Sequence, residues 1–131
     1  MKCWGDNLVA QLGDGTEARA STPVFVKDLS GAAAAGAGYF HTCAALADGG
    51  ARCWGSNDFG ELGDGTTVRV RTPERVRMVG SLRSVSAWFS HSCGVLADGT
   101  AACWGINTSG ELGEGKTVGT AQYPLPVTVN W

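Results

Sequence analysis

The sequence has few charged residues and no long stretch that favours a helix. Charged side chains make up 17% of the 131 residues, below the roughly 25% typical of soluble proteins. The longest stretch without Gly or Pro runs from Ser81 to Cys93, too short for a helical bundle or for the roughly 20 apolar residues of a membrane span. The N-terminus lacks the apolar run of a signal peptide. We therefore expect no membrane insertion, and more buried surface than a free-standing monomer has.

An excess of basic residues is also absent. The formal net charge is −2 and the isoelectric point is about 5.6, which argues against binding nucleic acid through a basic surface. Hydrophobic residues make up 44% of the chain and include five Trp, while 20 residues are Gly. This composition favours an ordered, mostly β protein with many turns.

One motif recurs with a period of 50 residues. Cys-Trp-Gly begins at residues 3, 53 and 103, and residues 1–50 match residues 51–100 at 20 positions without a gap. Leu-Gly-Asp-Gly-Thr follows in the first two copies and is weaker in the third, where Glu114 and Lys116 replace Asp and Thr. The glycines of the first two loops are Gly13, Gly15, Gly63 and Gly65. Such a period is typical of repeat architectures.

Each period reads as four strands. In the third copy we expect strands at 82–88, 90–96, 100–105 and 124–129, with a hairpin turn at Asp98-Gly99. Four strands in about 50 residues is typical of a β-propeller blade, which buries its faces against neighbouring blades. The Ala-rich run at 32–38 aligns with the first strand, so we interpret it as a strand; a short helical turn is the alternative. One indole per period supplies a bulky group for stacking, at Trp4, Trp54 and Trp104.

The order of these motifs resembles the repeat of the regulator of chromosome condensation family. The shared elements are Cys-Trp-Gly-x-Asn, Gly-Glu-Leu-Gly-x-Gly-Thr, a strand with Pro, and His-x-Cys-x-x-Leu-x-Asp-Gly. The resemblance implies an all-β propeller of about seven blades, of which this chain holds about two and a half. We expect half a blade at 1–29 and whole blades at 30–79 and 80–131. Ala10, where the other copies have Gly, departs from the pattern. The paired Cys resemble the bacterial, often exported branch.

The spacing of the five cysteines predicts two disulfides. Cys43 and Cys53 lie five residues on either side of Asp48, and the pair Cys93 and Cys103 flanks Asp98 in the same way. Directly opposed residues of a hairpin have the separation that a disulfide needs. This predicts an oxidising compartment, extracellular or periplasmic; buried reduced thiols are the alternative. Cys3 is left unpaired, because its partner would lie ten residues upstream, so we expect the chain to be part of a longer protein.

His41 and His91 recur with the period, so we interpret them as structural. We expect their ring nitrogens to satisfy loop backbone groups at a blade junction. A zinc site of His41, Cys43 and Cys53 is disfavoured by the ligand number and spacing. The Gly-Asp-Gly loops lack the residues of a phosphate loop and the oxygens of a calcium site, so we interpret them as turns. We expect no metal, no cofactor and no catalytic constellation, and therefore not an enzyme.

Residues that do not recur are the candidates for a binding surface. Four arginines of the middle repeat alternate along an extended segment and could bind an acidic partner; a solvated edge is the alternative. They are Arg69, Arg71, Arg75 and Arg77. Trp88 and Phe89 are candidate contact residues, with core packing as the alternative.

The sequence thus favours a non-enzymatic protein-interaction module with a protein partner. The resemblance implies the same, because family members range from a nucleotide-exchange factor for a small GTPase to a secreted inhibitor of β-lactamase. A structural or cell-surface repeat array is the alternative. Uncovered blade faces also predict self-association of the isolated chain.

Overall fold

The structure, a computed structural model, describes residues 1–78, 80–115 and 122–130. Regular structure in these residues consists of ten β-strands and no helix. They are β1 (Lys2–Gly5), β2 (Ala20–Phe25), β3 (Ala32–Ala37), β4 (His41–Leu46), β5 (Ala51–Gly55), β6 (Val70–Arg75), β7 (Leu82–Trp88), β8 (His91–Leu96), β9 (Ala101–Ile106) and β10 (Gln122–Thr128). The all-β prediction is therefore confirmed.

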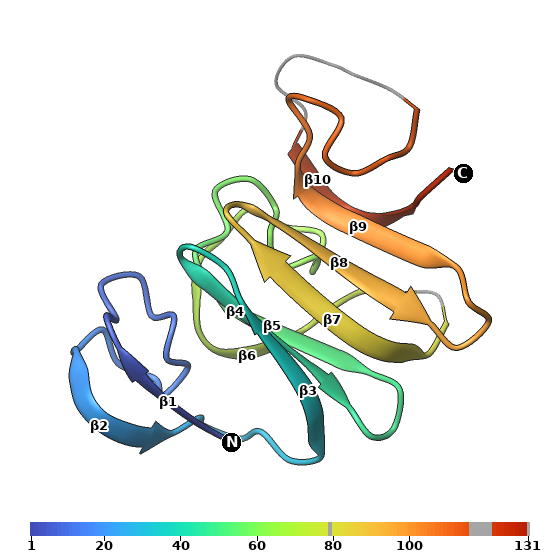
Figure 1. Ribbon diagram of the computed structural model, residues 1–131. Helices are drawn as coiled ribbons and strands as arrows, with labels where there is room; N and C mark the ends of the chain where they lie inside the picture. The colour runs from blue at the N-terminus through green and yellow to red at the C-terminus, as the bar shows by residue number, and fades with distance from the viewer. Residues whose placement is uncertain (79, 116–121, 131) are drawn as a thin grey trace.

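The strands form three antiparallel sheets, which we call blades. Blade 1 holds β1 and β2, blade 2 holds β3-β4-β5-β6, and blade 3 holds β7-β8-β9-β10 in spatial order. Figure 1 shows blade 1 at one end, blade 2 in the middle and blade 3 at the other end. Lys116 and the predicted blade limits at residues 79 and 131 lie outside the described residues.

The hairpins have the register that the cysteine spacing predicts. Cys43 lies opposite Cys53 and Cys93 opposite Cys103. In the intervening turn of blade 2, Gly49 has a φ of +86° and the Gly50 amide donates to Asp48 Oδ1 at 2.8 Å. The turn therefore depends on a residue free to adopt a positive φ and on a short carboxylate.

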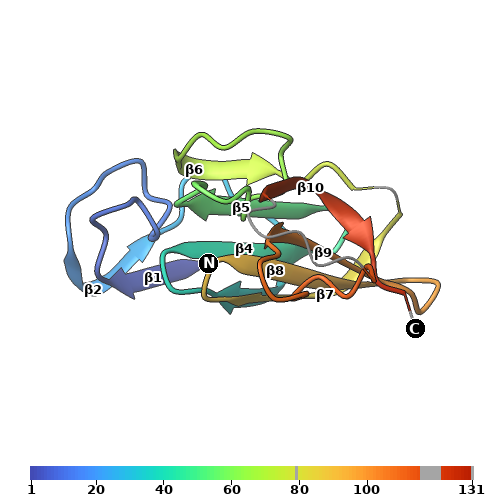
Figure 2. The same ribbon diagram turned by 90° about the horizontal axis from the view of Figure 1, so that it is seen from above.

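The Ala-rich run is strand β3, as expected. A Cβ placed on Gly36 would lie 2.8 Å from the backbone nitrogen of Ala87 in β7, so the first strands of blades 2 and 3 approach closely. Both β3 and β4 contact β7. In the view from above, β7 and β6 lie on opposite sides of the molecule (Figure 2). Small side chains permit this approach.

The core lies between the blades. Cys43, Cys53 and Leu62 of blade 2 pack with Val85 and Trp104 of blade 3. Between blades 1 and 2 a smaller cluster joins Val26, Ala44 and Trp54. Each blade thus buries its apolar face on a neighbour, as the repeat predicts.

The second strand of blade 3 is shorter than expected. Ser90 was predicted to begin it, but β8 begins at His91 and Ser90 lies in the turn after Phe89. Phe89 has a φ of +22°, outside the strand region of backbone conformation. The turn therefore includes both Phe89 and Ser90.

Candidate interaction site

Four exposed aromatic side chains lie where the first strand turns into the second in blades 2 and 3, with Trp88 as the last residue of β7 and the other three in the turns. We call these four side chains the aromatic patch. Tyr39 and Trp88 are 65% and 72% exposed, and Phe40 and Phe89 are 43% and 57% exposed. Exposure of Trp88 and Phe89 excludes the core-packing alternative for these residues. Single exposed apolar residues are normal, but a group of four rings is not.

Contacts between the rings join the two turns into one surface. The Tyr39 and Phe89 ring centroids are 5.7 Å apart, and the Tyr39 and Phe40 centroids are 4.5 Å apart in an edge-on arrangement. The Tyr39 amide also donates to the Phe89 carbonyl at 3.3 Å. Tyr39 and Phe40 were not among the predicted site residues, although the Tyr-Phe pair before His41 was a visible signal.

The repeated indole is the central group of each blade junction. Trp54 is fully buried, and its Nε1–H donates to the Gln11 carbonyl of blade 1 at 2.9 Å. The Trp104 Nε1–H makes the equivalent hydrogen bond to the Glu61 carbonyl of blade 2 at 2.8 Å. A Cβ on Gly13 or on Gly63 would lie within 3 Å of the next blade's indole. These glycines therefore serve close packing as well as turn geometry.

Trp4 does not take part in such a junction. It is 64% exposed among the described residues, so the stacking of this indole between blades stays a prediction. Trp54 and Trp104 donate to carbonyls in the long loop of the blade before them.

His41 lies at a blade junction, as predicted, but its partner is a side chain. Nε2 lies 2.8 Å from Ser92 Oγ, and that hydroxyl donates its proton to the Glu61 carbonyl at 3.1 Å. Ser92 therefore accepts from Nε2–H, which leaves Nδ1 as an acceptor without a hydrogen-bond partner in the described residues. Burial lowers the pKa of His41 to about 4, and nearby His91 adds to the effect. His91 is half-buried, and burial also lowers its pKa.

The long loops between third and fourth strands are organised by a buried asparagine. Asn57 Oδ1 accepts from the Leu62 amide at 3.0 Å, while Nδ2 donates to the Thr66 and Val68 carbonyls at 3.2 and 3.1 Å. Asp64 Oδ1 accepts from the Thr66 amide at 2.8 Å. Sequence reasoning noted this asparagine only as a motif position. These hydrogen bonds hold the loop as a closed turn.

The departures at Ala10 and Glu114 keep features of this loop. Ala10 has a φ of +65°, close to the +82° of Gly60 at the same place. Glu114 replaces the loop aspartate and accepts from Asn107 Nδ2 at 3.2 Å.

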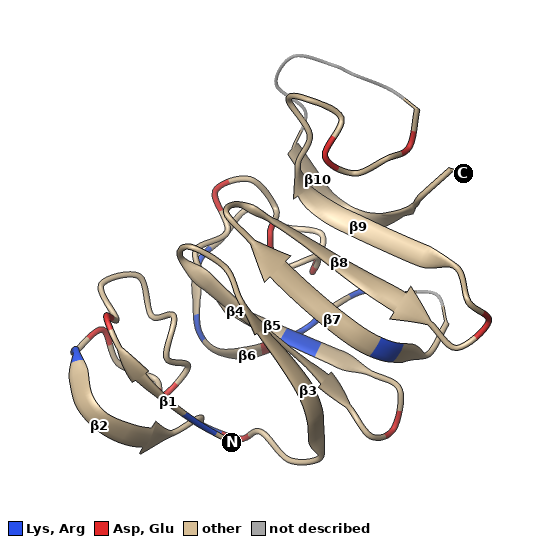
Figure 3. Ribbon diagram, in the orientation of Figure 1, with Lys and Arg blue, Asp and Glu red and all other residues tan. Residues whose placement is uncertain are grey.

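The four arginines are distributed along β6, the loop before it and the segment after it. Arg69 and Arg71 both bind Glu17 of blade 1, at 2.9 and 3.1 Å. Arg77 lies beside Gly65, as Lys27 lies beside Gly15. Arg75 lies opposite Arg52 in the β5–β6 pairing. Several basic residues lie on strands, whereas acidic residues lie mostly in loops and turns (Figure 3). A joint acidic-partner site on these arginines stays a prediction.

The predicted cysteine pairs lie at bonding distance. The S–S distances are 2.05 Å for Cys43–Cys53 and 2.10 Å for Cys93–Cys103. Cys3 is half-buried with a free thiol, and burial raises its pKa. Over residues 1–78, 80–115 and 122–130, no three His, Cys, Asp or Glu side chains gather as a metal site would need. Within the same residues, no helix is long and apolar enough to cross a membrane.

Comparison with known proteins relates the repeat to one family. A family model described as "Regulator of chromosome condensation (RCC1) repeat" matches residues 3–45 and 48–95, and a second model with the same description matches residues 33–61 and 83–111. A search of curated proteins finds no match.

Three solved structures share the fold. Prp20p from Saccharomyces cerevisiae matches at 23% identity and a TM-score of 0.82, over 99% of this chain and 34% of that chain. A structure of Kap60 bound to yeast RCC1 (Prp20) matches at 23% and 0.83, over 99% and 33%. Human WBSCR16 matches at 19% and 0.80, over 98% and 34%. The chain spans about a third of the length of the chains it matches, and the likeness shows a shared β-propeller fold.

Proposed function

The chain belongs to the regulator of chromosome condensation (RCC1) repeat family, and from this premise we propose that it is a non-enzymatic protein-interaction module within a β-propeller. The similar structures support binding to protein as the general role: Prp20p is described with its binding properties to Gsp1p and histones, and yeast RCC1 (Prp20) as bound by Kap60. Those partners belong to those proteins. For this chain we propose a protein partner of its own.

The observation that carries the proposal is the aromatic patch. Aromatic side chains are enriched where proteins bind proteins, because each buries a large area at a small cost in side-chain entropy. Here four such side chains lie at two neighbouring turns, and three of them, Tyr39, Phe40 and Phe89, are in ring contact. No charged residue lies in the turns at 38–40 and 89–90. The partner that fits is a protein with an apolar surface of its own.

Phe89 adds a second reason to assign a function to these turns. Its φ of +22° is rarely adopted by a bulky side chain. Backbone strain of this kind costs about 1–3 kcal/mol and is concentrated at functional sites. The position of the Phe89 ring beside Tyr39 is therefore maintained at some expense of stability.

We place the protein outside the cytoplasm in this proposal. The two cysteine pairs at bonding distance are compatible with an extracellular or periplasmic location, where disulfides persist. The competing function, a structural repeat array at the cell surface, shares this location. It differs in having no need for an exposed aromatic patch.

The test is capture of a partner with variants of the patch. Trp88→Ala with Phe89→Ala should weaken capture of a specific, mass-identified protein by about 30-fold or more, because the loss of even one hot-spot residue costs about 2 kcal/mol or more. Phe25→Ala is the matched control, since Phe25 is also 72% exposed but lies in β2 of blade 1. Circular dichroism should show both variants folded. Equal capture of the partner by the unsubstituted protein and by both variants would show that the aromatic patch is not the binding surface.

The arginine hypothesis has its own variant. Arg75→Ser with Arg77→Ser leaves in place Arg69 and Arg71, the arginines that pair with Glu17, so these blade 1 contacts remain intact. A loss of capture that depends on salt would support an acidic partner surface. Unchanged capture would leave the aromatic patch as the binding surface.

A further inference from the structure

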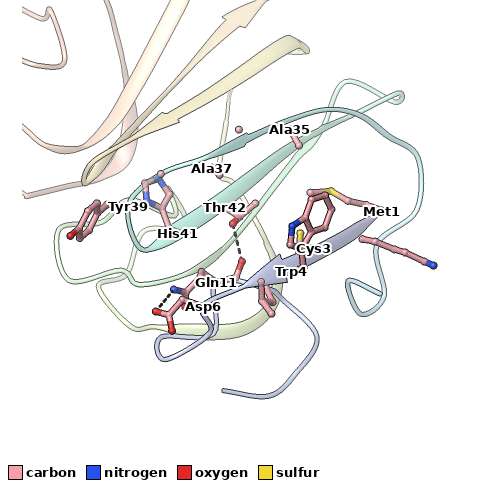
Figure 4. Close-up of a pocket in the computed structure, with 14 residues that line it drawn as sticks. Met1, Cys3, Trp4, Asp6, Gln11, Ala35, Ala37, Tyr39, His41 and Thr42 are labelled. Carbon is pink, nitrogen blue, oxygen red and sulfur yellow. Dashed lines mark hydrogen bonds between the residues drawn. The ribbon is translucent and has the colours of Figure 1, made fainter. Parts of the chain in front are cut away.

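A hollow of about 260 Å³ lies in blade 2 beside the hairpin turn that follows β4. Its lining consists of Leu46, Asp48, Gly50, Ala51, Arg52 and Arg75. It is separate from the cavity of about 430 Å³ between β1 and the β3–β4 pair, which Figure 4 shows with Thr42 hydrogen-bonded to Gln11. All the lining residues of the smaller hollow belong to blade 2, so that blade forms it without a neighbour.

Two arginines lie side by side in this lining. Arg52 of β5 is directly opposite Arg75 of β6 in the antiparallel register, so the two side chains project from the same face of the sheet. Arg52 is half-buried and Arg75 is exposed. Figure 3 shows basic residues on both β5 and β6. The hollow is therefore lined by two guanidinium groups from neighbouring strands.

This pair of arginines costs stability, because like charges directly opposite each other destabilise paired strands. Among the described residues, neither Arg52 nor Arg75 forms an ion pair. Asp48 also lines the hollow, but its Oδ1 accepts from the Gly50 amide at 2.8 Å. Glu74 Oε1 accepts from the backbone amide of Arg75 at 3.0 Å. The nearby carboxylates thus bind backbone amides, and the two guanidinium charges are not offset by an ion pair.

The equivalent position in the other two blades carries no such repulsion. In blade 1, Lys2 lies opposite Phe25, and Lys2 Nζ is 4.5 Å from the centre of the Phe25 ring, a favourable contact between a cation and an aromatic ring. In blade 3, Ala102 lies opposite Thr128, and neither side chain is charged. The opposed arginines are therefore a feature of blade 2 and not a requirement of the repeat.

The place of the arginines within the blade makes them accessible to a ligand. Blades 2 and 3 contact each other mainly through β3, β4 and β7. Arg52 and Arg75 lie instead on β5 and β6, the last two strands in the spatial order of blade 2. A hollow on these strands is thus away from the strands through which the two blades pack.

We propose that Arg52 and Arg75 together bind one tetrahedral oxyanion, a phosphate or sulfate group, in this hollow. Each guanidinium presents a planar fork of N–H donors that fits such a group. A tetrahedral group has enough oxygens to accept from both forks at once, whereas a single fork already engages both oxygens of a carboxylate. The charge of the anion also offsets the repulsion between the arginines. Since the net charge of the chain is −2, the attraction is local to this pair.

This site is independent of the aromatic patch and of partner capture. Arg52 is not among the arginines considered above for an acidic protein surface. Binding of a small anion is measured without any protein partner, so a negative result here leaves the proposed function untouched. A chain that captures no partner could equally still bind the anion.

The experiment is a titration of the isotope-labelled chain with sodium sulfate or sodium phosphate, followed by nuclear magnetic resonance at the arginine Nε–H signals. Sodium chloride holds the ionic strength constant, because salt screens exposed charges. The signals of Arg52 and Arg75 should shift and saturate at millimolar sulfate or phosphate. Sodium acetate should shift them less and without saturation. A response to sulfate and phosphate that does not saturate, or equal binding of acetate, would overturn the proposal.

Substitutions separate the arginine pair from the charge of the whole chain. Arg52→Gln should raise the dissociation constant for sulfate about tenfold or more, because charge-assisted hydrogen bonds are lost. Arg52→Lys keeps the charge but lacks the planar fork, so it should retain only part of the affinity. Arg83→Gln is the matched control, since it removes the same charge from an exposed position in β7 and should leave the affinity unchanged. Equal losses in Arg52→Gln and Arg83→Gln would reject the proposal.

Urea unfolding provides a second measurement that needs no resonance assignment. A ligand that binds the folded chain alone raises the midpoint of unfolding. Millimolar sulfate should therefore raise the midpoint of the unsubstituted chain and of Arg83→Gln, but not that of Arg52→Gln. Sulfate also stabilises proteins generally through exclusion from their surface, and this effect acts on all three proteins alike. Equal rises in the three proteins would overturn the proposal.

Discussion

Replacement of the repeated tryptophan by Ala should reduce stability by very different amounts at Trp54 and at Trp4. Trp54 is fully buried at the junction of blades 1 and 2, whereas Trp4 at the equivalent position is 64% exposed. Trp54→Ala leaves a cavity beside Gly13 and removes one of the two donors to the Gln11 carbonyl, with Thr42 as the other. Truncation of a buried Trp costs about 3–5 kcal/mol, and an exposed one about 0.5 kcal/mol or less. We expect this difference between Trp54→Ala and Trp4→Ala.

The assay is urea unfolding followed by far-ultraviolet circular dichroism, because removal of an indole alters fluorescence. The slope of free energy against urea should stay constant, so that a change in midpoint reports stability. Repetition at several protein concentrations separates folding from association. If the two variants lose the same free energy, the assignment of the indole to the blade junction is wrong. A large loss in Trp4→Ala would show that Trp4 is buried in solution.

The remaining predictions concern the loops, the junction histidine and the blade faces. Gly63→Ala should cost about 1–3 kcal/mol more than Gly99→Ala in urea unfolding, because both have positive φ but only Gly63 faces an indole within 3 Å. Asn57→Ala should cost about 2–3 kcal/mol, and the exposed Asn130→Ala much less, since three backbone groups lose their partner in the first. As the pH falls from 6.5 to about 4, His41 becomes protonated in the unfolded chain but not in the folded one. About 3 kcal/mol of the free energy of unfolding is therefore lost in that window. His41→Gln should make the free energy of unfolding depend less on pH over the same range. Light scattering should show association that rises with concentration, and a monomer at all concentrations would contradict it.

The candidate site was only partly predictable from sequence. Trp88 and Phe89 stood out because they do not recur, but burial decides whether such residues bind a partner, and periodicity does not report it. Tyr39 and Phe40 join them only because β3 and β7 approach closely enough for the turns to touch. For Arg69 and Arg71, the common partner Glu17 lies in another repeat. A contact between repeats depends on how the blades pack.

The sequence by itself determined the architecture and the strand register of this protein. A 50-residue period defines repeated units of equal conformation, and cysteines equidistant from a turn lie opposite each other in any antiparallel hairpin. These are local rules of spacing. The tertiary structure decided which of the equivalent residues are buried: Trp54 and Trp4 share a motif, yet a neighbouring loop covers only the first. Burial depends on what lies across a junction, so identical repeats acquire different roles according to their place in the array.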